Sequence, residues 1–413
     1  MVKKNIVIVG AGFGGVTAAL RLARKVKAFR NEYKIILIDR HHHQLYTPAL
    51  YEIAAILRRN ISDIALKSAV LIPITDIIDG KPIEFLSDEL TGINTASRNI
   101  ILKNSGAFPY EYLILALGSE TNYFDISGLK EYSLPLKTFD DATRLRNTIE
   151  NYFIKNGSLK IAVGGGGSTG VELVAEFINF ICLLQERLKK NHHACSVEFI
   201  LLEASPEILP GFETWIIKKT KKRLAEMGVK IKTNTAVAAV TAKNIILKDG
   251  SNESYDILIW TGGVKGPAIL AEWSLPLSNK GSLIINEYLK VSSDNEHIFA
   301  IGDNSAFTHP RTGKALVWNV PVAEAEGRLA AENISRIIRG KPLQKFSPMK
   351  KYPFILAVGK KYAIADLIYI RFSGITGWLA KLLVELRYLL FILPFKKAMR
   401  TWWLSVKIYS SND

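Results

Sequence analysis

The chain has 413 residues, of which 48% are hydrophobic and 22% are charged, so it is not a disordered protein and is long enough for two or three domains. Its 54 Lys and Arg residues outnumber its 38 Asp and Glu residues, which gives a net charge of +16. This surplus favours an anionic partner: nucleic acid, an acidic membrane or a phosphorylated ligand. Two cysteines exclude a disulfide framework and favour a reducing compartment.

An apolar strand pattern begins at 6–9, so no targeting segment is expected, and charges interrupt the long apolar stretches, so no membrane-spanning helix is expected. Two glycine-rich loops, at 10–15 and 165–170, each follow a β-branched strand pattern and lead into a helical pattern. In each half a second apolar strand follows and ends in an acid, Asp39 or Glu203. The order of strand, loop, helix, strand and acid, found twice, indicates two nucleotide-binding units.

The segments downstream of the two loops also match. The sequence NIILK occurs at 99–103 and again at 244–248. Each copy is followed by a turn and an apolar strand, which ends in the glycine-containing segment 116–119 or 260–263. Two coincidental glycine loops would not reproduce these distal features. We therefore predict an α/β fold with two Rossmann-like dinucleotide-binding domains and β-meanders, one domain being inserted in the other.

The first glycine loop has the residues that a pyrophosphate needs. Gly10 permits the tight turn, Gly12 lets the pyrophosphate approach the backbone, and Gly15 lets the helix pack closely on the strand. The diphosphate would lie at the positive end of the following helix. Asp39 is expected to accept a hydrogen bond from the adenosine ribose.

The second loop repeats this pattern with Gly165, Gly167 and Gly170. The acid that ends its second strand is Glu203, and a carboxylate there repels a 2′-phosphate. The next residues, 204–207, add no basic side chain. The second loop is therefore predicted to bind NADH rather than NADPH.

Two dinucleotides imply a flavin on one and a nicotinamide on the other, because electron transfer needs one carrier to face the other. A further apolar strand ends in Gly302 and Asp303, which indicates that the first domain resumes after the second. Asp303 suits a carboxylate that hydrogen-bonds the ribityl chain of FAD or orders water near the pyrophosphate; the alternative is an N-cap for the next helix. The expected boundaries are 1–120 and 276–345 for the FAD-binding domain, 121–275 for the NADH-binding domain and 346–413 for a C-terminal membrane-association region.

Four segments resemble the type II NADH:quinone oxidoreductases, the single-subunit non-pumping NADH dehydrogenases. Residues 165–172 are close to the family's GGGxTGVE, and 45–52 resemble its early loop passing under the flavin. Residues 118–124 are similar to its GSxTNxF segment, and 300–303 match its FAD motif. The resemblance covers most of the chain and implies tightly but non-covalently bound FAD, hydride transfer from NADH to FAD, and passage of two electrons to a membrane quinone without proton pumping.

The resemblance also assigns residues. It implies that Glu172 is a carboxylate near the nicotinamide and quinone sites that assists proton delivery, although a first-turn helix acid would also be favoured there by the helix dipole. The further positions expected at the cofactors are Thr47, Pro48, Ala116, Gly118 and Gly302 for FAD, and Gly262 for NADH. A homodimer bound peripherally to the cytoplasmic face of a prokaryotic cell membrane is expected.

Two departures from the family affect the acceptor. The glutamines that contact the quinone head are absent from 318–327, and the family's Lys-Gly pair is missing near 351–360. The alternatives are a soluble NADH:electron-carrier reductase, a non-enzymatic NADH-sensing redox module and a sulfide:quinone reductase-like enzyme. The last needs paired cysteines at the flavin, where neither Cys182 nor Cys195 is expected.

From about Gly374 the sequence changes character. Apolar residues dominate 378–393, where Lys381, Glu385 and Tyr388 recur at helical spacing, and a second segment, 395–407, combines aromatic and basic residues. These features predict two interfacial helices that dock on an anionic membrane surface. The alternatives are a helix capping the core and a homodimer interface.

Two other patterns are set aside. His41, His42 and His43 are consecutive, so they project in different directions, and a loop near the flavin is expected there rather than a metal site. The positive charge has no accompanying nucleic-acid recognition motif, so no nucleic-acid partner is expected.

Overall fold

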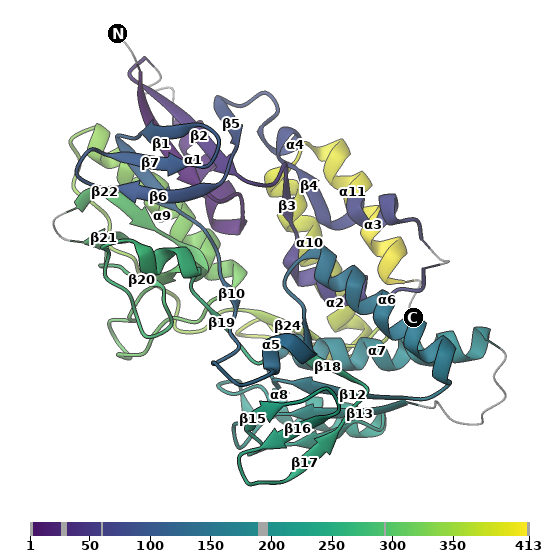
Figure 1. Ribbon diagram of the computed structural model, residues 1–413. Coiled ribbons are helices and arrows are strands. Elements are labelled where there is room, and N and C mark those ends of the chain that lie inside the picture. The colour runs from purple at the N-terminus through teal and green to yellow at the C-terminus, as the bar shows by residue number, and fades with distance from the viewer. Residues whose placement is uncertain (1–2, 26–30, 59–60, 189–196, 293–294, 411–413) are drawn as a thin grey trace.

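The computed structural model describes residues 3–25, 31–58, 61–188, 197–292 and 295–410. These residues form two mainly parallel sheets flanked by helices, and two long C-terminal helices lie to one side of them (Figure 1). The predicted α/β fold with two dinucleotide-binding units and β-meanders is confirmed.

The first sheet has the strand order β21-β22-β9-β1-β2-β5 and is parallel except for β21. Its strands are β1 (Lys4–Val9), β2 (Tyr33–Asp39), β5 (Ile83–Ser87), β9 (Tyr112–Leu115), β21 (Lys290–Ser292) and β22 (Asn295–Ala300). Its central strands are continuous apolar runs because both faces are covered. Helices α1 (Phe13–Lys25) and α9 (Val320–Ile338) pack closely together, so the chain does return to the first unit after the second.

The second sheet has the order β11-β18-β12-β13-β14, and all of its strands are parallel. Its strands are β11 (Ser133–Pro135), β12 (Leu159–Gly164), β13 (Val197–Leu202), β14 (Lys230–Lys232) and β18 (Ile257–Trp260), and its helices are α6 (Phe139–Asn156), α7 (Ser168–Arg187) and α8 (Thr214–Glu226). Helix α6 begins at a capping box between Thr138 and Asp141 and ends at Gly157, whose φ of +76° a glycine adopts without strain.

The repeated NIILK segments form the middle strands of two equivalent three-stranded meanders. The first consists of β6 (Leu90–Asn94), β7 (Asn99–Leu102) and β8 (Gly106–Pro109); the second consists of β15 (Val237–Val240), β16 (Asn244–Leu247) and β17 (Asn252–Ser254). Between the two units, β10 (Glu120–Thr121) pairs with β19 (Val264–Lys265) where the chain leaves the first unit and where it returns.

The remaining short elements frame the two units. They are β3 (His43–Leu45), η2 (Thr47–Ala49), α2 (Leu50–Ala54), α3 (Asp63–Val70), β4 (Leu71–Pro73), α4 (Ile74–Ile78), α5 (Leu129–Tyr132), η3 (Ala268–Glu272), β20 (Leu283–Ile284), η4 (Gly302–Asn304) and β23 (Ser305–Ala306). Strands β3 and β4 pair antiparallel, and η2 leads directly into α2. The segment that the resemblance places under the flavin is therefore a single helical turn followed by a short helix.

The C-terminal region begins with the antiparallel sheet β24 (Phe354–Ala357), β25 (Ala363–Asp366) and β26 (Arg371–Gly374). Helix α10 (Ile375–Ile392) packs on this sheet, and α11 (Phe395–Tyr409) folds back along α10 and against α3 (Figure 1). In the described part of the chain, α7 alone is long and apolar enough to cross a membrane by length and composition, and 67% of its apolar window is buried within the protein.

Candidate functional site

The two glycine loops have the same backbone geometry. Gly10 has a φ of +104° and Gly165 a φ of +106°, in the region that favours glycine. A Cβ on Gly10 would lie 2.2 Å from the carbonyl oxygen of Ala116, and a Cβ on Gly165 would lie 2.5 Å from the Cα of Gly262. The structure thus brings each loop against the strand end that the sequence repeat pairs with it.

The last glycine of each loop permits close packing of helix on strand. A Cβ on Gly15 would lie 1.8 Å from the carbonyl oxygen of Gly10, and a Cβ on Gly170 would lie 2.0 Å from that of Gly165. No side chain fits at either position, so the backbone approach predicted from the sequence is present in both units.

The middle glycines face open space. A Cβ on Gly12 or on Gly167 would meet no atom within 4 Å. Each lies at the start of a helix, α1 or α7, where the first backbone N–H groups have no partner in the helix. An open glycine surface beside free N–H groups at a helix N-terminus fits a dinucleotide pyrophosphate. Both loops therefore fit the cofactors predicted for them.

The acids at the ends of the second strands anchor the loops. Asp39 accepts hydrogen bonds from the N–H of Ala11 at 2.6 Å and from that of His41 at 2.8 Å. Glu203, which is buried, accepts from Gly166 at 2.7 Å and from Ser205 at 2.7 Å. Each acid thus holds the edge of its pyrophosphate loop, beside which the adenosine ribose of a dinucleotide lies in this fold class.

Asp303 lies at the end of the first sheet, within η4. It accepts a hydrogen bond from the Ser119 hydroxyl at 2.8 Å, and the Lys137 ammonium donates to the same hydroxyl at 2.8 Å. The cap of the following long helix α9 is Asn319, so the alternative role of Asp303 as the N-cap of that helix is wrong. Gly118, with a φ of +73°, precedes Ser119 and forms the turn that reaches Asp303.

Glu172 lies in α7 just beyond its first turn, which holds no acidic residue, so the alternative of a first-turn acid held by the helix dipole is wrong. The N–H of Ala357 in β24 donates to its carboxyl at 3.4 Å. Burial raises the pKa of Glu172 to about 8, and the nearby Lys381 ammonium opposes this rise. A carboxyl that keeps its proton near neutral pH can act as an acid.

Sequence reasoning missed Lys381 and Glu326 as site residues. Lys381 appears in the sequence as an interruption of an apolar stretch, yet it forms an ion pair with Glu52 of α2. Glu326 stands in the segment that lacks the family's glutamines, and it accepts hydrogen bonds from the Gly302 N–H at 2.6 Å and from the Ser305 hydroxyl at 3.2 Å. Only the repeated spacing of charged residues within apolar helices could have indicated them.

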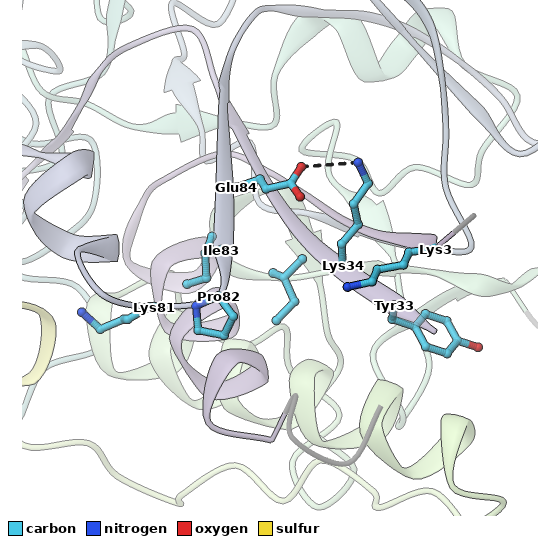
Figure 2. Close-up of a pocket in the computed structure, with 8 residues that line it drawn as sticks. Lys3, Tyr33, Lys34, Lys81, Pro82, Ile83 and Glu84 are labelled. Atoms are coloured by element: carbon cyan, nitrogen blue, oxygen red, sulfur yellow. Dashed lines mark hydrogen bonds and ion pairs between the residues drawn. The ribbon is translucent and has the colours of Figure 1, made fainter. Parts of the chain in front are cut away.

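A hollow near β2 and β5 is distinct from this site. Figure 2 shows its lining residues, among them Lys3, Lys81 and the ion pair between Lys34 and Glu84. Tyr33, Lys34 and Ile83 lie at the amino ends of β2 and β5, whereas the glycine loops lie at the carboxyl ends of their strands. Ligands of open parallel sheets bind at the carboxyl ends, so this hollow is not the cofactor site.

Comparison with known proteins agrees with this geometry. The sequence profile of the pyridine nucleotide-disulphide oxidoreductase family matches residues 4–327. A type II NADH:quinone oxidoreductase of Staphylococcus saprophyticus is 26% identical over 355 residues, which cover 83% of this chain and 85% of that protein. The Staphylococcus aureus protein of the same name has the same identity and coverage.

Solved structures share the fold. The structure of NDH2 from Plasmodium falciparum in complex with NADH superposes with a TM-score of 0.83 at 20% identity, covering 98% of both chains. The sulfide:quinone oxidoreductase of Aquifex aeolicus superposes with a TM-score of 0.75 at 19% identity, covering 94% of this chain and 91% of the other. At these identities the likeness concerns the fold.

Proposed function

Because this chain belongs to the pyridine nucleotide-disulphide oxidoreductase family and resembles type II NADH:quinone oxidoreductases along most of its length, we propose that it is an FAD-dependent NADH:quinone oxidoreductase. The observation that carries the proposal is the pair of equivalent loops, each open at its middle glycine and each anchored by a carboxylate. One loop suits FAD and the other suits NADH.

The residues around the first loop would hold FAD. Gly10, Gly12 and Gly15 would receive its pyrophosphate and Asp39 its ribose, while Asp303, fixed by Ser119, would receive the ribityl chain. Thr47 and Pro48 in η2, Ala116 and Gly118 after β9, and Gly302 complete the proposed set. Bound FAD supplies the hydride acceptor and the electron carrier.

The second loop would hold NADH through Gly165, Gly167 and Gly170, with Gly262 opposite and Glu203 at the ribose. A buried carboxylate there repels a 2′-phosphate, which supports NADH over NADPH. We assign the proposed boundaries 1–120 and 276–345 to the FAD-binding domain, 121–275 to the NADH-binding domain and 346–413 to the membrane-association region.

Glu172 is proposed as the acid that serves the acceptor. It lies in the helix that follows the NADH loop, just beyond the first turn, and its raised pKa keeps it largely protonated at neutral pH. The positions of the cysteines do not support the alternative of a sulfide:quinone reductase-like enzyme. Cys182 lies 14 residues along α7 from Ser168, about 21 Å at 1.5 Å per residue, and Cys195 lies outside the described residues.

Helix α10 supports a membrane-docking surface because it buries ionisable side chains and leaves leucines exposed. Lys381, Glu385 and Tyr388 face the protein interior, whereas Leu379 and Leu383 are 48% and 61% exposed. A soluble helix buries its apolar face and exposes its charges.

The neighbouring segments extend this surface. Tyr369, Ile370, Phe395 and Trp403 are also exposed, and α11 adds Lys396, Arg400 and Lys407. Exposed apolar and aromatic side chains beside basic residues fit an anionic bilayer surface, and we propose that this surface docks on such a bilayer. We propose a peripheral protein on the cytoplasmic face of a prokaryotic membrane, as a homodimer that presents two such surfaces.

Vesicle flotation tests the docking surface. With vesicles containing anionic lipid, Leu383→Glu is expected to reduce the floating fraction at least about fivefold, because burying a charge in the bilayer interface is costly. Ile284→Glu, which alters an exposed apolar residue elsewhere, is the matched control. Equal flotation of both variants would contradict the assignment and favour a dimer interface, which sedimentation would then report.

Anaerobic stopped-flow tests the activity itself. The FAD-loaded protein is mixed with NADH and then with a quinone analogue. Fast bleaching of the flavin band followed by fast recovery is expected. Bleaching without recovery would retain the two nucleotide sites and remove quinone as the acceptor, in favour of a protein electron carrier. Slow bleaching would favour an NADH-sensing module.

A further inference from the structure

A cluster of ionisable side chains lies where α10 meets α2 and α7. Lys381 of α10 forms an ion pair with Glu52 of α2, and Glu52 is 3% exposed. The Lys381 ammonium lies 4.9 Å from the ring centroid of Tyr51 and 4.9 Å from that of Tyr409. One ammonium is thus held between two aromatic rings and a buried carboxylate.

Three further carboxyls act on this pair. Glu172 and Glu176 of α7 interact electrostatically with Lys381, and Glu385 lies one turn further along α10. The Tyr409 hydroxyl donates to Glu385 at 3.4 Å. Carboxyls that share one buried site oppose one another's ionisation, which favours retention of protons. Burial accordingly raises the pKa of Glu385 to about 7.

The location of the cluster connects it to both cofactor segments. Helix α2 follows the η2 turn directly, and α7 follows the second glycine loop directly. Within the part of the chain that the structure describes, the groups that act on Glu172 are Tyr51 and Glu52 of α2, Lys381 of α10 and the N–H of Ala357 in β24. The cluster therefore surrounds the carboxyl that the proposed function assigns to the acceptor.

Reduction of a quinone requires a proton from solvent. NADH delivers two electrons and one proton as a hydride, whereas a quinone takes up two electrons and two protons to become a quinol. One further proton per turnover must reach the acceptor. Two ferricyanide ions accept the same two electrons without taking up a proton, so ferricyanide reduction needs no such delivery.

Resting on the proposed function, we propose that Lys381 is a positioning residue for acceptor reduction: its ammonium, held by Glu52, fixes the charge around Glu172 and so sets the pH range in which that carboxyl donates a proton. The lysine comes from α10, the helix whose other face is the proposed docking surface. The same helix thereby supplies both the membrane contact and the charge that tunes the acid.

The two partners of the ion pair act on Glu172 with opposite signs. The Lys381 ammonium favours the ionised carboxylate and lowers the pKa of Glu172, whereas the Glu52 carboxylate raises it. Lys381→Met is therefore expected to move the alkaline limb of NADH:quinone activity upward by about one pH unit. Glu52→Gln is expected to move that limb downward.

The experiment compares the alkaline limbs of the pH profiles of NADH:quinone activity, measured with FAD-loaded, full-length protein. Ferricyanide reduction by each variant should retain at least about half of the wild-type rate, which verifies that both cofactor sites are intact. Lys397→Met is the matched control, because Lys397 lies in α11, the helix that folds back along α10, and pairs with Asp76 of α4 outside the cluster. Its limb is expected to stay at the wild-type pH.

Limbs that remain in place, or that move in the same direction in both variants, would overturn the proposal. If a single variant fails to fold, the double variant Glu52→Gln with Lys381→Met removes the pair without leaving a lone buried charge. Its limb should move less than that of Lys381→Met, because the two charges that act on Glu172 with opposite signs are removed together. A wild-type limb in Glu172→Gln would instead remove the proposed role of Glu172, and absence of quinone reduction in the wild type would remove the proposed function.

Discussion

In both units a carboxylate at the end of the second strand anchors the glycine loop, but the acid and the loop residue differ between the units. In the first unit Asp39 holds the N–H of Ala11 at 2.6 Å, and in the second Glu203 holds the N–H of Gly166 at 2.7 Å. The glutamate is longer by one methylene, and a Cβ on Gly166 would lie only 3.0 Å from its Cβ. The bond is thus preserved because the longer acid is matched by a smaller loop residue.

The largest expected effect comes from filling the open face of one loop at a time. Gly12→Val and Gly167→Val each place a Cβ where no protein atom lies within 4 Å, so folding should be unaffected. The first variant is expected to lose FAD and its yellow colour. The second is expected to stay yellow but to weaken NADH-dependent bleaching by about 100-fold, as overpacking costs of a few kcal/mol imply.

Absorbance spectra of the purified variants and bleaching titrations measure these losses. Thermal unfolding at a fixed FAD concentration verifies that each variant is folded. FAD retention by Gly12→Val would mean that the first loop does not receive the pyrophosphate.

The next effect concerns cofactor choice. Glu203→Ala removes the carboxylate that repels a 2′-phosphate, and the ratio of kcat/KM for NADH to that for NADPH is expected to fall about tenfold or more. Asp39→Ala is the matched variant in the first unit and should weaken FAD binding without changing that ratio. Steady-state kinetics with NADH and with NADPH measure this ratio. An unchanged ratio in Glu203→Ala would refute the assignment of Glu203 to the ribose.

A smaller effect tests the matching of acid and loop residue. Gly166→Ala brings a methyl group against Glu203 and Ile208, so KM for NADH is expected to rise about tenfold. Shortening the acid in the double variant Gly166→Ala with Glu203→Asp should restore most of the affinity, because it reproduces the pair found in the first unit. Ala11→Gly, which opens space in the first loop, should leave FAD binding within about twofold. If the effects of the two substitutions on KM simply add in the double variant, the proposed matching of acid and loop residue is wrong.

The loops could be predicted from the sequence, but the acceptor side could not. Strand, glycine loop, helix and acid follow one another locally, so spacing alone locates Gly10, Asp39, Gly165 and Glu203. Lys381 and Glu52 are 329 residues apart and meet only because α10 packs beside α2. Neither residue carries a local pattern that indicates its partner.

The orientation of α10 was equally hidden from the sequence. Its spacing of Lys381, Glu385 and Tyr388 defines one face but does not say whether that face meets solvent or protein. The structure places it inward, because α2, α7 and α11 provide partners for each charged group. Long-range packing, rather than periodicity, decides the direction of such a face.

The smallest expected effect compares two buried carboxyls, Glu172 of the second unit and Glu326 of the first. Burial raises the pKa of Glu326 to about 8, while the Gly302 N–H and the Ser305 hydroxyl oppose this rise. The unfolded chain releases that proton near the ordinary pKa of a glutamate, so the folded state loses stability as the pH rises from about 5 to 8. Glu326→Gln keeps an acceptor for Gly302 and does not titrate.

Glu326→Gln is therefore expected to raise the Tm of the FAD-loaded protein by about 2 °C at pH 8, and the gain should shrink toward zero at about pH 5. Glu332→Gln on the same helix is the control. Ion pairing with Lys25 and Arg21 lowers the pKa of Glu332, so that variant should lose stability above about pH 4. A pH-independent gain in Glu326→Gln would mean that the glutamate is ionised when folded, and the buried carboxyl of the first unit would then differ in kind from Glu172.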